Sequence, residues 1–304
     1  AQVGYHQQEN NRENMSTYGS KFKVIDFYSV SNCDPSTIIT RTNTSKRRIQ
    51  AISAQAEFGY NNMAFLTVRM RNDWSSTLPK NNNSYFYPAI EGSFIATELP
   101  FLKNQEWVTY LKIRGAYAQV GKDATPLSIY PSLEAVEDVG EGFRYGYTGP
   151  NESLKPEMTS SYEVGFEGRF LNDRITGTVE AYYRNTFDLL NNISIPLGSN
   201  FGKEVISNIG TMVNKGIELS ANFIPVQTND WNWEIGGNIT FQDVKITKLT
   251  NNDATYLGVE TGTSMGSNVG FSSLHRAGYA PNTYYLYEQL YDEVGNPIQN
   301  ALVD

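Results

Sequence analysis

The chain has 304 residues and a net charge of −8, with 32 acidic residues against 24 Lys and Arg. This balance, without any basic stripe, argues against nucleic acid as a partner. A single cysteine excludes an intrachain disulfide framework. No run of about 18 apolar residues, the length of a helical membrane span, occurs in the sequence. Both ends of the sequence look cut, so we expect a piece of a longer protein.

The sequence predicts about nine β-strands. Most are longer than the ordinary globular strand of about 5–6 residues and match the ~9–11 residues that cross a bilayer at a tilt. In chain order they cover roughly residues 1–8, 46–60, 63–74, 86–98, 107–121, 158–170, 174–187, 213–224 and 231–247.

The strands alternate between apolar and polar residues. In residues 174–184, Ile175, Val179 and Tyr183 fall on one face, whereas Glu180 and Arg184 fall on the other. A strand has a period of two, so each strand has one apolar and one charged face. A membrane barrel with lipid outside and a wet interior shows this pattern, and a water-soluble sheet with one wet face shows it as well.

The connections favour the barrel because short and long ones alternate. The short ones are Asn61-Asn62, residues 100–106, Leu171-Asn172-Asp173 and residues 227–230; the long ones are 9–45, 75–85, 122–157, 188–212 and the region from 248 onward. Outer-membrane barrels have tight periplasmic turns and long extracellular loops. Aromatic residues of an interfacial girdle lie beside the short turns: Tyr60, Trp107, Phe170, Trp231 and Trp233. We therefore predict an all-β, antiparallel transmembrane barrel.

Several segments in this order resemble the SusC/RagA-type TonB-dependent outer-membrane transporters. They are Arg69-Met-Arg-Asn-Asp-Trp-Ser-Ser76, Phe86-Tyr-Pro-Ala-Ile-Glu-Gly-Ser-Phe94, Leu111-Lys-Ile-Arg-Gly-Ala-Tyr-Ala-Gln-Val-Gly121, Leu154-Lys-Pro-Glu157, Tyr162-Glu-Val-Gly-Phe-Glu167, Asn214-Lys-Gly-Ile-Glu218 and the strand from Trp231 to Leu249. The resemblance implies a barrel of about 22 strands closed by an N-terminal plug domain, of which residues 1–304 supply somewhat less than half. The plug and the segment that recruits TonB are expected outside this chain.

The resemblance also implies a function. Members of the family are energy-dependent importers of oligomeric nutrients, driven by TonB from the inner membrane and covered by a SusD-type surface lipoprotein that acts as a lid. A glycan is the first candidate cargo and a peptide the second. A passive porin or structural barrel and a soluble carbohydrate-binding or adhesin protein are the alternatives.

Two groups of residues are candidates for these tasks. Charged residues predicted to face the interior and the plug are Arg69, Arg71, Asp73, Arg114, Glu163, Glu180 and Glu218. Aromatic residues of the long loops are candidates for stacking on a ligand, a partner or each other, and they are Trp74, Tyr85, Tyr130, Tyr145, Tyr147 and Tyr285. The region 248–304 is expected to form a long extracellular loop or hinge.

The sequence shows no catalytic constellation, and we predict neither an enzyme nor a cofactor. Its two histidines, His6 and His275, stand far apart, without a nucleophile at a motif spacing. No Cys and His cluster has metal-ligand spacing. Asn251-Asn252-Asp253 offers oxygen ligands for calcium, but we favour a plain Asx-rich turn as the explanation.

Overall fold

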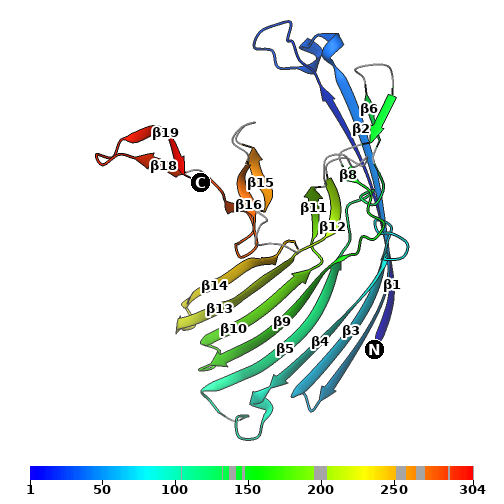
Figure 1. The fold of residues 1–304 in the computed structure, drawn as a ribbon. Helices are drawn as coiled ribbons and strands as arrows, with labels where there is room; N and C mark the ends of the chain where they lie inside the picture. The colour runs from blue at the N-terminus through cyan, green and yellow to red at the C-terminus, as the bar shows by residue number, and fades with distance from the viewer. Residues whose placement is uncertain are drawn as a thin grey trace.

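One antiparallel sheet of nine strands forms most of the molecule (Figure 1). The computed structural model describes residues 1–103, 105–131, 133–136, 142–145, 148–194, 204–250, 258–264, 271–286 and 288–303. The sheet strands pair in chain order: β1 (Gln2–Tyr18), β2 (Ile39–Tyr60), β3 (Ala64–Ser75), β4 (Ser84–Ile95), β5 (Val108–Lys122), β9 (Glu157–Phe170), β10 (Ile175–Phe187), β13 (Thr211–Gln227) and β14 (Asn232–Lys248). All nine predicted strands are confirmed.

The register keeps the two faces separate across the sheet. Directly opposed residues point to the same side, and an apolar row runs through Val68, Ile90, Tyr117, Tyr162 and Tyr183 on five successive strands. Such side chains are open to the surroundings: Val164 is 62% exposed and Ile239 is 51% exposed. A broad exposed apolar face requires an apolar covering, and lipid supplies it.

Tight turns join the strands at one end of the sheet. Asn61 and Asn62 have positive φ angles of 48° and 54°, and Leu171, Asn172 and Asp173 repeat this conformation at the next tight turn. Asn and Asp tolerate this region because their short side chains hydrogen-bond locally. The connection after β4 contains a 3₁₀ helix, η3 (Ala96–Glu98). Beside these turns the rings of Trp107 and Phe170 stack with centroids 6.4 Å apart, as expected at a membrane interface.

The predicted long loop at 9–45 is wrong in its extent. β1 continues to Tyr18 and β2 begins at Ile39, so the two strands form a ribbon that extends beyond their neighbours (Figure 1). Apolar alternation ends near Tyr5, but Thr, Ser and Asn can still pair through the backbone in water. Only residues 19–38 form the loop, which contains η1 (Val30–Asn32) and η2 (Pro35–Thr37).

The other long connections contain small sheets. β6 (Leu133–Val136) pairs with β7 (Gly142–Tyr145); β8 (Thr148–Gly149), β11 (Leu190–Ser194) and β12 (Glu204–Asn208) form a second sheet. Beyond β14 come β15 (Val259–Ser264), β16 (Phe271–His275), β17 (Thr283–Tyr284), β18 (Glu288–Tyr291) and β19 (Pro297–Val303). Within the described ranges no helix is long and apolar enough to cross a membrane.

Candidate functional site: the polar face and its cap

Ion pairs between strands cover the polar face of the sheet. Three arginines each meet a glutamate of another strand: Arg69 with Glu91 at 3.3 Å, Arg184 with Glu163 at 3.1 Å, and Arg114 with Glu180. The register places these pairs on one face, because Glu91 and Glu163 both lie opposite Ala116 of β5, two residues from Arg114. Six of these side chains are between one fifth and one half exposed. These charged side chains are therefore only partly covered by the chain itself.

Gly165 makes the longest of these contacts possible. It lies between Arg114 on β5 and Glu180 on β10 in the register of β9. A Cβ atom at this position would lie 2.5 Å from Nε of Arg114, so the missing side chain lets the guanidinium reach across a whole strand. Glu218 lies directly opposite Glu180 on β13. The row therefore places two carboxylates directly opposite each other, and directly opposed like charges repel.

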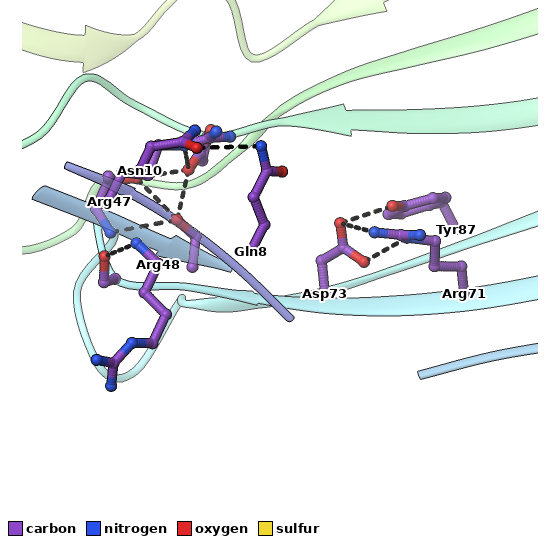
Figure 2. A network of polar contacts seen from close by, with 11 residues as sticks. Gln8, Asn10, Arg47, Arg48, Arg71, Asp73 and Tyr87 are labelled. Atoms are coloured by element: carbon purple, nitrogen blue, oxygen red, sulfur yellow. Dashed lines mark hydrogen bonds and ion pairs between the residues drawn. The ribbon is translucent and has the colours of Figure 1, made fainter. Parts of the chain in front are cut away.

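Asp73 forms a second polar group nearer the extracellular end. Its carboxylate accepts hydrogen bonds from Nε of Arg71 at 2.7 Å and from the hydroxyl of Tyr87 at 2.8 Å (Figure 2). The Asp73 side chain is only 7% exposed. A charged group this far removed from water needs such partners, because burying it without hydrogen bonds is costly. Arg71 and Asp73 therefore lie on the predicted face but bind each other.

A small hydrophobic core, here called the cap, joins the loops over β3, β4 and β5. It contains Leu78, Tyr85, Ala124, Ile129 and Leu154, of which Leu154 is fully buried. Residues of the connections after β3 and β5 thus pack together, although the sequence predicts separate polar loops. Asn side chains tie further segments to it: Asn208 exchanges hydrogen bonds with the backbone of Lys155, and Asn82 donates to the carbonyl of Ser153.

Asp123 fixes the base of the cap. Its carboxylate accepts two hydrogen bonds from Arg47, at 2.6 and 2.8 Å, and others from the hydroxyls of Ser75 and Thr77. Burial raises the pKa of the Asp123 carboxyl, but the hydrogen bonds and the charge of Arg47 outweigh burial and lower the pKa below its ordinary value. The sequence analysis did not identify these residues. Two sequence signals pointed to this site: an Asp that directly follows a strand, and the closely spaced hydroxyls of Ser75 and Thr77.

A cavity of about 570 Å³ opens beside the cap. It is lined by Ser76, Leu78, Pro79, Lys80, Asn81, Ile129, Tyr130 and Glu152. Tyr130 is 61% exposed and is the aromatic residue of this lining. The arrangement combines an accessible aromatic face with amide, hydroxyl and charged groups, which suits a polar ligand with apolar ring faces.

The predicted aromatic residues do not form one site. Trp74 lies in β3 on the same face of the sheet as Met70, and its role as a ligand residue stays a prediction. Tyr85 is 6% exposed, and its ring packs within the cap. Tyr285 is half-buried beside β16. Tyr145 is placed by its backbone alone, and Tyr147 and the Asn251–Asp253 stretch lie outside the described residues.

An antiparallel sheet with an apolar outer face, a charged inner face, tight turns at one end and large loops at the other defines a segment of an outer-membrane β-barrel. Comparison with known proteins identifies the family to which this barrel segment belongs. Residues 2–297 match the family model "TonB dependent receptor-like, beta-barrel". The chain belongs to this family, and its location is the bacterial outer membrane.

Two relatives and one solved structure illustrate the similarity. The chain is 37% identical to "TonB-dependent receptor SusC" of Bacteroides thetaiotaomicron, over 80% of this chain and 25% of that protein. It is 28% identical to "TonB-dependent receptor P26" of Formosa agariphila, over 71% of this chain and 22% of that protein. The "Structure of the RagAB peptide transporter" matches with a TM-score of 0.77 and 20% identity, over 97% of this chain and 34% of that one. The chain thus spans about a quarter of the curated relatives it matches.

Proposed function

We propose that the protein containing this chain imports oligomeric nutrients across the outer membrane, driven by TonB and without covalent chemistry of its own. A glycan is the first candidate for the cargo, and a peptide is the second. The observation that carries this proposal is the open cavity bordered by Tyr130 at the extracellular end of a TonB-dependent receptor barrel. The ring of Tyr130 would stack on a sugar, while Asn81 and Glu152 would bond its hydroxyls.

The polar face takes the second role in this proposal. Its paired charges, such as Arg69 with Glu91 and Arg184 with Glu163, would contact the plug domain and line the route that opens when the plug moves. Their partial exposure supports this role, since fully satisfied and buried pairs would offer nothing to another surface. Arg114, Glu180 and Glu218 belong to the same surface.

A SusD-type surface lipoprotein is the proposed partner on the extracellular side. The β1–β2 ribbon supports this assignment because it carries a folded tip, residues 19–38, beyond the end of the sheet. Asn32 holds this tip with two side-chain bonds of 2.7 Å to the carbonyls of Val24 and Phe27. Ile25 and Tyr28 are more than 80% exposed there, which is unusual for apolar side chains in water.

Growth of a deletion strain tests the proposal. The strain is complemented with the full-length gene, with Tyr130→Ala, or with Tyr291→Ala as a control that removes an exposed tyrosine of β18 outside the cavity lining. Candidate glycans and peptides serve as sole carbon sources. We expect the deletion to abolish growth on one class, Tyr130→Ala to slow it, and the control to restore it. Undiminished uptake of every candidate by the deletion strain would reject the proposal.

The alternatives give different results in the same strains. A passive porin would take up the cargo equally well without TonB, so loss of uptake in a tonB deletion separates the two. A soluble adhesin or carbohydrate-binding protein conflicts with the family and with the exposed apolar face. The Tyr130→Ala variant is equally informative if the cargo is a peptide. Tyr130 is exposed and lies outside the cap core, so slower growth would report a lost ligand contact and not a loss of packing.

A further inference from the structure

Charged residues are rare on the apolar face of the sheet. In β3, β4, β5, β9 and β10 the register places none there. β13 and β14 are different: Lys215 lies opposite Tyr183 on one side and Asp243 on the other, and Lys245 follows two residues after Asp243. These three residues share the side of the sheet that carries Ile217 and Phe241, which faces lipid.

The length of apolar strand between this cluster and the tight turn gives the height of the cluster. The row of Tyr117, Tyr162 and Tyr183 continues directly into Lys215 and Asp243. Below the row, the apolar face of β14 runs from Trp233 near the tight turn to Phe241, a length that matches the ~9–11 residues needed to cross the hydrocarbon. Tyrosines mark the membrane interface. The two lysines therefore lie at the level of the lipid headgroups on the extracellular side.

The geometry leaves both ammonium groups available. Nζ of Lys215 is 3.7 Å from Oδ2 of Asp243, and Nζ of Lys245 is 3.6 Å from the same oxygen. The lysine side chains are 59% and 56% exposed. Two cations that share one carboxylate carry a net positive charge. Elsewhere on this face, Arg48 on β2 is held one-to-one by Glu9 at 2.7 Å.

We propose that Lys215 and Lys245 bind the phosphate groups of anionic lipids in the outer leaflet, with Asp243 holding the two ammonium groups in position. A lysine beside an apolar face extends its stem along that face and keeps its charge in the headgroup layer. Basic residues at this level attract anionic lipids. The flanking tyrosine and apolar rows are open to acyl chains, which favours a lipid over a soluble anion. This inference does not depend on the identity of the cargo.

Native mass spectrometry of the full-length protein in detergent tests the proposal. The probes are lipid A that carries its phosphate groups and chemically dephosphorylated lipid A. The variant is Lys215→Gln with Lys245→Gln. The matched control is Lys21→Gln with Lys23→Gln, which removes the same charge from the tip beyond the membrane. The heat-modifiable band on unboiled gels shows that each variant is a folded barrel.

We expect the Lys215 and Lys245 double variant to lose about 25-fold in affinity for phosphorylated lipid A, since each lysine near a charged membrane surface contributes about fivefold. The control variant and a Lys-to-Arg double variant should bind like the wild type. Dephosphorylated lipid A should bind wild type and variant equally and weakly. Equal binding of phosphorylated lipid A to wild type and to the folded glutamine variant would overturn the proposal, as would equal binding of both probes to the wild type.

Discussion

Replacing Asp123 with Ala should open the cap without unfolding the barrel. The substitution removes the acceptor of four hydrogen bonds and leaves Arg47, Ser75 and Thr77 without their common partner. Breaking a buried ion pair costs about 3–5 kcal/mol. The Asp123 side chain is 5% exposed, but that of Arg47 is 31% exposed and regains water, so we expect the lower end, about 3 kcal/mol. This corresponds to roughly a hundredfold faster local opening.

Hydrogen exchange of the full-length protein in detergent measures this opening. The amides of Ser76 and Ser128 report on the cap because they donate to the carbonyls of Arg48 and Thr125. Their protection should fall roughly a hundredfold in Asp123→Ala, while amides within β9 and β10 stay protected. Asp26→Ala on the exposed tip is the control. Unchanged protection at Ser76 and Ser128 in a folded Asp123→Ala protein would refute the assigned role of the carboxylate.

The same carboxylate predicts a dependence on pH. The pKa of Asp123 is lowered in the folded protein, so its stabilising contribution is complete above the ordinary pKa of an Asp, about 4, and is lost as the pH falls through the lower folded value. Cap protection, normalised to intrinsic exchange rates, should therefore stay constant from neutral pH to about 5 and decline below about 4. A decline already complete at pH 6 would implicate another group.

Two further predictions concern the sheet itself. Gly216→Ala places a Cβ atom 2.6 Å from the carbonyl oxygen of Phe241, and this overpacking should destabilise the barrel by about 1–3 kcal/mol. The loss should be seen as a lower thermal midpoint of the unboiled gel band. Gly237→Ala, with nothing within 4 Å of the new atom, should leave the midpoint unchanged. Leu219→Lys puts a charge on the lipid side in the middle of β13 and should cost about 2–4 kcal/mol and reduce folded protein in the membrane, whereas Ser220→Lys on the polar face should assemble normally. Equal midpoints of the two glycine variants would contradict the overpacking at Gly216. Equal effects of Leu219→Lys and Ser220→Lys would show that the faces are assigned incorrectly.

The sequence by itself determined the strands, their faces and the tight turns. These features are local: side chains alternate along each strand, and positive φ at Asn61 and Asn62 needs only the residues of the turn. The lipid-facing direction of Trp74 also follows from this alternation, since it has the parity of Met70.

The tertiary structure decided the cap and the candidate site. Arg47 and Asp123 are 76 residues apart in the chain, and no sequence pattern at either residue predicts their contact. Their contact arises because β2 lies three strands from β5 and continues past the end of β3, so that Arg47 reaches the residue that follows β5. Likewise, Lys215 and Lys245 become neighbours only through the register of β13 with β14. Periodicity fixes the face on which a side chain lies, whereas strand pairing across the sheet fixes its partners.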